Sequence, residues 1–327
     1  MSIPRFHTIS DLLKMPKPQW LIEGLFEANS LVMVAGAPGS FKSFLVLDWI
    51  MCMALGKDWH GKRVNPSKVL YILGEGKASL LKRMLAWFEH HGCTNEKDFP
   101  RLNENLRVTF DVPQLREKEH YGGLMSAITA DPTFDPSVIV IDTFARSFVG
   151  GDENSSLDTG LWIKAAESLR AVGYTVIFLH HTRKNTEFGH QFRGSSAISG
   201  AMDTIITVVR NYEENFVKVA VTKQKDHDEG EPMTFRRQCV TTSDKEALDS
   251  MVLTLLPPTT RTAEERVLRE VLDNPALTKQ QDRINEIAAR LNIKPLAAKQ
   301  RLWRFKERLK EEMPNPDDLS DLVESES

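Results

Sequence analysis

The sequence predicts an α/β domain with a mainly parallel central sheet flanked by helices, followed by a small all-helical domain. Short apolar runs alternate with longer helical segments, which is typical of a parallel sheet covered on both faces. One alternation encloses a glycine-rich, phosphate-binding pattern at residues 36–43. After LPP at residues 256–258, only helical patterns follow. We therefore predict domains at 1–258, with a short N-terminal segment at 1–30, and at 259–312, then an acidic tail at 313–327.

The elements of the first domain follow from the spacing of apolar residues, taken in chain order. Strands are predicted at residues 31–35, 69–73, 106–110, 137–142 and 174–179, and helices at 44–55, 78–91 and 159–172. Three further strands are predicted at 204–209, 217–222 and 234–240. Because no helical pattern separates these last three, we expect them to be neighbours in the sheet.

The second domain is predicted to contain three helices, at residues 262–272, 279–291 and 295–312. The turn at 291–295 joins the last two in the manner of a helix-turn-helix. Seven basic residues lie between positions 294 and 310 against one acid, Glu307. This basic face predicts contacts with DNA phosphates, with Lys299, Arg301 and Arg304 as candidates, and the alternative is a protein-binding unit. The acidic tail predicts a disordered segment.

The composition excludes several classes of protein. A hydrophobic content of 41% and a charged content of 27% are typical of a soluble globular protein. No apolar run reaches the roughly 18 residues of a membrane span, and the N-terminus lacks a signal-peptide core. The three cysteines are far apart and in no metal-ligand spacing. We expect a cytoplasmic protein without a membrane partner, and a net charge of −3 restricts any nucleic-acid binding to local basic patches.

Residues 36–43, GAPGSFKS, predict a phosphate-binding loop between a strand and a helix. Its glycines let backbone N–H groups turn inward around an anion, and the helix adds its positive end. Lys42 is expected to reach the β- and γ-phosphates of ATP, and the Ser43 hydroxyl to ligate Mg²⁺. Phe41 stands where the pattern GxxxxGK[ST] has its second glycine. The candidate ATP-binding residues are Gly36, Ala37, Pro38, Gly39, Ser40, Phe41, Lys42 and Ser43.

Three more strand ends supply candidate groups for hydrolysis. Asp142 closes the apolar run 138–142 and is predicted to hold Mg²⁺ through water, while Glu75 is predicted to orient and polarise the attacking water. His180 and His181 end a third strand. Adjacent residues on a strand point to opposite faces, so one histidine is expected to be buried and His181 is the preferred γ-phosphate sensor. The alternatives are that Asp142 only caps its strand, that Glu75 is a solvated turn residue, and that both histidines have an ordinary polar role.

The polar segment at residues 182–192 follows the histidines and precedes RGSS at 193–196. A loop after a sensor strand can couple hydrolysis to movement. Its candidate DNA-binding residues are Arg183, Lys184, His190 and Arg193. The alternative is an ordinary mobile surface loop.

Taken together, these motifs resemble the RecA-like ATPase core of the hexameric replicative helicases, in particular the RepA family and the DnaB core. In chain order they are GAPGSFKS, the strand-end Glu75, VIVID at 138–142, FLHHTRK at 178–184, RGSS at 193–196 and VTKQKDHDEG at 221–230. The resemblance covers roughly residues 20–245. It is closer to RepA, because almost nothing precedes the core and no primase-binding domain is present.

The resemblance implies a ring of six subunits, with ATP and Mg²⁺ at the subunit interfaces and single-stranded DNA in a central channel. Loops at 148–156 and 182–191 would line that channel. In the DnaB-type pattern a basic pair reaches the neighbouring subunit's ATP, and Lys223 and Lys225 occupy the matching positions. The second residue is usually arginine, and a lysine cannot make its planar bidentate contact. Replication partners are expected at the C-terminal unit or tail.

Three functions follow. The first is an ATP-dependent DNA helicase or translocase of the RepA-like ring type, acting in replication. The second is a recombinase or strand-annealing ATPase, and the third is a DNA-binding regulator switched by ATP. Directional unwinding would favour the first, strand exchange the second and operator-like binding the third, because one core serves all three activities.

Overall fold

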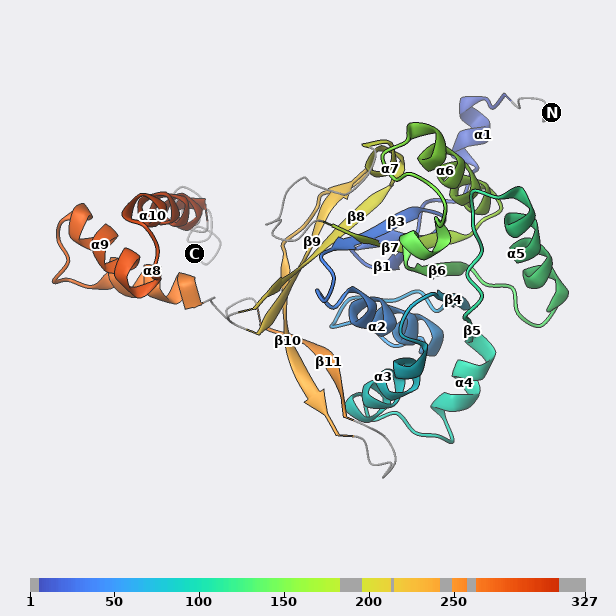
Figure 1. Ribbon diagram of the computed structural model, residues 1–327, viewed down its shortest axis with the longest axis horizontal. Helices are drawn as coiled ribbons and strands as arrows, with labels where there is room; N and C mark the ends of the chain where they lie inside the picture. The colour runs from blue at the N-terminus through green and yellow to red at the C-terminus, as the bar shows by residue number, and fades with distance from the viewer. Residues whose placement is uncertain (1–5, 183–195, 213–214, 242–248, 258–262, 312–327) are drawn as a thin grey trace, which may run out of the picture. The chain divides into compact units, whose positions relative to one another are not determined.

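The computed structural model describes residues 6–182, 196–212, 215–241, 249–257 and 263–311. It divides into two compact units, Met1–Leu256 and Pro257–Ser327. The first unit is built around a nine-stranded sheet in the order β11-β10-β9-β8-β3-β7-β6-β4-β5 (Figure 1). The strands are β3 (Leu31–Gly36), β4 (Val69–Leu73), β5 (Leu106–Thr109), β6 (Val138–Asp142), β7 (Thr175–His181), β8 (Thr204–Asn211), β9 (Phe216–Gln224), β10 (Met233–Val240) and β11 (Ser250–Leu255).

The pairing of neighbouring strands changes once across the sheet, from parallel to antiparallel. From β5 to β8 all neighbours are parallel, and from β8 to β11 all are antiparallel. This confirms the predicted mainly parallel α/β sheet and the adjacency of β8, β9 and β10. The phosphate-loop strand β3 and the strand β6, which ends in Asp142, are separated only by β7. The carboxyl ends of all three strands therefore meet at one edge of the sheet.

Helices cover both faces of the sheet (Figure 1). One core contains buried residues of α2 (Lys42–Leu55), α3 (Lys77–His90) and α4 (Asp98–Asn105), and the other those of α5 (Lys118–Ala130), α6 (Ser156–Ala171) and α7 (Ser196–Ala201). Successive residues of a strand alternate between the two cores: Val32 and Val34 belong to the first, Leu31 and Met33 to the second. This double coverage explains why the central strands β3, β4 and β6 are apolar along almost their whole length.

The helix α2, which follows the phosphate loop, is buried along almost its whole length. Its one carboxylate, Asp48, is 4% exposed and accepts hydrogen bonds from the indole N–H groups of Trp59 and Trp87, each at 2.6 Å. His60 Nε2 lies 3.2 Å from the same carboxylate. These bonds tie α2 to α3 and to the loop that follows α2, and so fix the helix that carries Lys42 and Ser43.

Several elements lacked a clear sequence pattern. They are α1 (Ile9–Leu13), β1 (Trp20–Ile22), β2 (Phe26–Glu27), α4, α5, α7, β11 and the 3₁₀ turn η1 (Phe144–Ser147). Most are short, and α5 contains Gly122 and Gly123 and buries only Leu124 and Ile128, so its apolar periodicity is weak. In the described part of the chain, no helix combines the length and apolar character that crossing a bilayer requires.

The second unit contains α8 (Ala263–Asp273), α9 (Gln280–Arg290) and α10 (Pro295–Glu311). These helices begin within one residue of the predicted positions. They share a small core of apolar side chains that includes Val271, Ile287 and Leu302. Arg301 of α10 donates a hydrogen bond of 2.8 Å to Glu264 of α8.

Candidate functional site

The loop at residues 36–43 begins in a tightly packed position. A Cβ atom on Gly36 would lie 2.3 Å from the carbonyl oxygen of Val208 on β8 and 2.7 Å from Ser40 Oγ, so only glycine fits. Gly39 has φ of +74° and Phe41 has φ of 73°, both in the left-handed region. This conformation costs a non-glycine residue roughly 1–2 kcal/mol. The Phe41 ring contacts Arg210, Arg237 and Phe44, and these contacts offset the strain.

Lys42 lies folded against the loop that carries it. Its ammonium donates to the carbonyl oxygens of Gly36 at 2.7 Å and Ala37 at 2.9 Å, and lies 3.3 Å from His181 Nδ1. The side chain is only 4% exposed. Burial lowers the pKa of Lys42 to about 8, although the charges of Asp142 and Glu75 act in the opposite direction. A polyanion bound in the loop would favour the charged form of this amine.

The two predicted magnesium ligands are brought together. Asp142 is 2% exposed and accepts hydrogen bonds from the hydroxyls of Ser43 and, at 2.9 Å, Tyr71. Burial is the main cause that raises the pKa of Asp142, and those two hydrogen bonds oppose it. One carboxylate and one hydroxyl suit Mg²⁺, which keeps waters and phosphate oxygens as its other ligands. Among the described residues no cluster of three His, Cys, Asp or Glu side chains could hold a metal alone.

Two buried hydroxyls beside these groups also fit a phosphate or hydrated ion. Ser40 Oγ in the loop and Thr143 Oγ1, next to Asp142, are buried and have no hydrogen-bond partner within the described ranges. Buried hydroxyls without partners are unfavourable, so a ligand that supplies polar atoms at both positions would remove this cost. The residues present therefore fit a magnesium–nucleotide complex.

Glu75 lies in the turn between β4 and α3, at the same edge of the sheet. Its Oε1 is 3.0 Å from the Nε of Arg146, which belongs to η1 directly after β6. A Cβ on the neighbouring Gly74 would lie 2.8 Å from the Cβ of Arg146, so the two segments are in close contact. The backbone N–H of Gly74 donates to the carbonyl oxygen of Asp142 at 2.6 Å, so Glu75 follows directly after the contact between these two strand ends. Its predicted role in orienting water stays a prediction.

The two histidines at the end of β7 differ in environment. His180 is 2% exposed and its ring lies against Phe144, with centroids 4.9 Å apart. His181 is half-buried and faces Lys42. The structure thus distinguishes a buried histidine from one that faces the phosphate loop, and the predicted sensor role of His181 stays a prediction.

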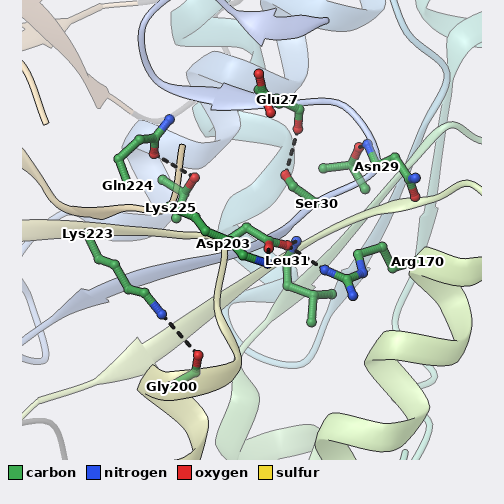
Figure 2. Close-up of polar contacts among 12 residues, drawn as sticks. Glu27, Asn29, Ser30, Leu31, Arg170, Gly200, Asp203, Lys223, Gln224 and Lys225 are labelled. Carbon is green, nitrogen blue, oxygen red and sulfur yellow. Dashed lines mark hydrogen bonds and ion pairs between the residues drawn. The ribbon is translucent and has the colours of Figure 1, made fainter. Parts of the chain in front are cut away.

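Lys223 and Lys225 lie at the opposite end of the sheet from the phosphate loop. Gln224 between them pairs with Thr204, which pairs with Val32 near the beginning of β3. Lys223 donates to the carbonyl oxygens of Ser199 and Gly200, at 2.9 and 3.0 Å. Figure 2 shows Lys225 beside Asp203, whose carboxylate also accepts from Arg170 and from the backbone of Leu31. Within this chain, both lysines therefore lie away from the phosphate loop.

The predicted DNA-binding residues fall into two groups. Arg183, Lys184, His190 and Arg193 lie outside the described residues. On α10, Lys299 and Arg304 are exposed, while Arg301 is bonded to Glu264 and helps to hold α10 against α8. Arg301 is therefore less available to a DNA phosphate than its two neighbours.

Sequence reasoning missed four further residues around the loop: Tyr71, Arg146, Arg210 and Arg237. Tyr71 left a usable signal, because it is the only polar side chain in the apolar run VLYIL at residues 69–73. The arginines left none. They come from β8, β10 and the turn after β6, and only the sheet order brings them to the phosphate loop.

Two comparisons with known proteins gave matches. The AAA domain family matches residues 5–187, more than half of the chain. A solved structure whose title describes it as an ATPase domain is 15% identical with a TM-score of 0.45, over 63% of this chain and 81% of that chain. No curated protein matches the sequence significantly.

Proposed function

Because this chain belongs to the AAA domain family, whose P-loop site hydrolyses ATP, we propose that it is an ATP-driven DNA helicase or translocase. It would hydrolyse ATP at the interfaces of a homo-hexameric ring and move along single-stranded DNA during replication. The observation that carries the ATPase part is the convergence of Lys42, Ser43 and Asp142 with Glu75 at one edge of the sheet. The resemblance of the motif order to RepA-type helicases supports the motor part.

Each residue of this site has a separate proposed role in hydrolysis. Backbone N–H groups of the loop and the Lys42 ammonium bind the phosphates, and Lys42 exchanges its carbonyl partners for phosphate oxygens. Ser43 and Asp142 would hold Mg²⁺, which would supply positive charge to the phosphates of the nucleotide. Once its carboxylate is released from Arg146, Glu75 accepts the proton of the attacking water as the water oxygen adds to the γ-phosphorus. The bond between the γ-phosphorus and the β,γ-bridging oxygen breaks in the same displacement, and ADP leaves with that oxygen.

The position of Lys223 and Lys225 supports a ring. Since these lysines lie at the end of the sheet away from their own phosphate loop, a role in catalysis requires the loop of a neighbouring subunit. A charge supplied in this way can raise the rate by about 10³–10⁵ in nucleotide hydrolases. Lys225→Ala subunits mixed with Glu75→Gln subunits test the arrangement: recovered hydrolysis supports shared sites, and its absence at all mixing ratios argues against them.

Two substitutions in the site separate binding from chemistry. Lys42→Ala is expected to abolish hydrolysis and weaken ATP binding, because it removes the cation that faces the phosphates. Glu75→Gln is expected to bind ATP normally but to hydrolyse it about 10²–10⁴-fold more slowly, because an amide cannot accept the proton. Hydrolysis rates and equilibrium binding of ATP are the measurements. Turnover that survives in Lys42→Ala would refute the phosphate-loop assignment, and wild-type turnover in Glu75→Gln would reduce Glu75 to a turn residue.

A regulator switched by ATP is the second candidate, because the second unit presents a basic face. From Lys294 to Lys306 there are five basic residues and no acid. Leu296 and Trp303 of α10 are 70% and 65% exposed and share this face with Lys299 and Arg304. Exposed apolar and basic side chains on the second helix of a helix pair suit contacts with DNA bases and phosphates. Tight, sequence-specific duplex binding without unwinding would favour the regulator.

A further inference from the structure

A cavity of about 700 Å³ lies between strand β5 and helix α5, and we call it the β5–α5 cavity. β5 is the last strand at one side of the sheet, separated by three strands from β3, which leads into the phosphate loop (Figure 1). None of the described residues that line the cavity belongs to the phosphate loop or to the groups assigned to hydrolysis. Sites for small molecules have volumes of roughly 300–1,000 Å³, so this cavity is large enough for an organic ligand.

The β5–α5 cavity exists because α5 carries small residues where it borders the space. Gly123 and Ala127, one helical turn apart, both line the cavity. A Cβ atom on Gly123 would meet no other atom within 4 Å, and Gly123 lies inside the helix Lys118–Ala130. The fold therefore does not require a glycine at this position, although a glycine is unfavourable inside a helix. A bound ligand would need the space that a larger side chain would fill.

The walls of the cavity are largely apolar. Ile128 and Phe134 line it and belong to the buried core, whereas Phe110, which also lines it, is 40% exposed. The remaining apolar side chains of the lining come from β4, from the segment after β5 and from α5, and they are Leu70, Val112 and Leu124. An apolar ligand body would remove its own surface and the exposed part of Phe110 from water, which favours binding.

Two acidic side chains of the cavity have no partner. Asp111 and Glu119 line it and are exposed, and their carboxylates form no hydrogen bond or ion pair with the described residues. His120, which also lines the cavity, uses its Nδ1 to accept a hydrogen bond of 3.1 Å from the backbone N–H of Gln114. Unpaired carboxylates beside apolar walls attract a ligand with positive charge.

The basic groups nearby have other contacts. Arg107 lines the cavity, but its Nε lies 3.7 Å from a carboxylate oxygen of Asp131, and its guanidinium carbon lies 4.7 Å from the ring centroid of Phe134. The ammonium of Lys77 lies over the Phe110 ring, 4.4 Å from its centroid. The lining therefore carries three carboxylates against one guanidinium, and an excess of negative charge remains.

We propose that the β5–α5 cavity binds a small organic cation, in which an ammonium or guanidinium group is joined to an apolar body. The apolar body occupies the space beside Gly123 and contacts the apolar walls. The cationic group lies next to the carboxylates of Asp111 and Glu119, and the faces of the aromatic rings in the lining also attract it. This site is separate from the proposed nucleotide site and does not depend on it.

Three probes with similar apolar bodies and different charges test the chemistry of the ligand. They are 4-phenylbutylammonium, 4-phenylbutanol and 4-phenylbutyrate, each titrated into the full-length protein without nucleotide and followed by ligand-observed NMR. The ammonium is expected to bind most tightly and the carboxylate most weakly. The double variant Asp111→Asn, Glu119→Gln should bind the ammonium about three- to tenfold more weakly and the alcohol as before, because exposed charge pairs each contribute little. Equal binding of the three probes, or unchanged ammonium binding in the double variant, would overturn the proposal.

Gly123→Leu tests the place of binding, because its side chain would fill the cavity. This variant should lose binding of the ammonium and the alcohol without a lower thermal stability, since leucine is more favourable than glycine in a helix. The matched control is Gly122→Leu: Gly122 has the same free space around it but does not line the cavity, so binding should equal that of the wild type. Wild-type binding in Gly123→Leu, or an equal loss in both variants, would overturn the proposal. A wild type that binds no probe, and that self-associates only while Gly123 is intact, would assign the cavity to a second copy and overturn it too.

Discussion

At the scale of single residues, the site is a set of buried polar groups that depend on one another. Lys42 is charged yet only 4% exposed, and Asp142 is 2% exposed with two hydroxyl partners. Burial lowers the pKa of the amine to about 8 and raises the pKa of the carboxyl. A buried charged amine destabilises the folded protein below pH 8, and this cost falls as the pH rises from about 8 towards the ordinary value of the amine.

This lowered pKa predicts that nucleotide binding takes up protons. At pH 8 about half of the Lys42 side chains are neutral, and bound phosphates restore the charged form because they lie next to the amine. ADP binding at pH 8 should therefore take up about half a proton, falling towards zero at pH 6. Calorimetry in buffers of different ionisation enthalpy measures this number. Lys42→Arg, which stays charged, is the control, and equal uptake by both proteins would contradict the assignment.

At the scale of elements, the function depends on how α2 is fixed. Asp48 accepts two indole hydrogen bonds inside the core, so removing the carboxylate leaves two buried donors without an acceptor. Asp48→Ala is expected to lower the free energy of unfolding by about 2–5 kcal/mol. Urea unfolding followed by tryptophan fluorescence measures the loss. The exposed Asp58→Ala, ten residues further along, should change stability by less than about 0.5 kcal/mol. Equal stability of the two variants would exclude Asp48 as an anchor.

The face of α10 gives a second prediction at this scale, which concerns salt. Each lysine or arginine that neutralises a DNA phosphate contributes about one unit to the slope of log affinity against log salt concentration. Lys299→Ala and Arg304→Ala should each reduce that slope by about one for the full-length protein. Trp303→Ala should weaken DNA binding but leave the slope unchanged. Arg290→Ala removes a basic residue of α9 that is bonded to Glu270 and Glu286, and should leave the slope unchanged. Identical slopes in all variants would assign this face to a protein partner.

The sequence predicts the strongly patterned elements well, for physical reasons. Strand β4 at Val69–Leu73 has the predicted bounds, because a short run of apolar residues between turn residues is typical of a strand that is buried on both faces. Helix α2 begins at Lys42, two residues before the predicted start, because the last two residues of the phosphate loop, Lys42 and Ser43, already belong to its first turn. Edge elements such as β11 were missed, since they bury only part of their residues. Likewise, the phosphate loop and Asp142 carry local motifs, while Arg146, Arg210 and Arg237 depend on contacts between distant segments.

At the scale of the whole molecule, the chain consists of a nucleotide-binding sheet domain and a small helical unit. The division falls at residue 256, two residues from the boundary placed by LPP. One end of the sheet carries the phosphate loop, and the other carries Lys223 and Lys225 with Asp203, which Figure 2 shows together. If Lys223 and Lys225 complete the phosphate site of a second copy, as we propose, the copies must associate head to tail, and such an association closes into a ring when the rotation between subunits permits.

ATP hydrolysis with and without single-stranded DNA, measured together with the mass of the protein in solution, tests the ring motor most directly. If subunits complete one another's sites around a strand, DNA should stimulate hydrolysis strongly and the active species should have the mass of a ring. Lys42→Ala provides the baseline for contaminating activity. Hydrolysis that is indifferent to DNA, or a protein that remains a monomer with ATP, would contradict the motor and favour the ATP-switched regulator.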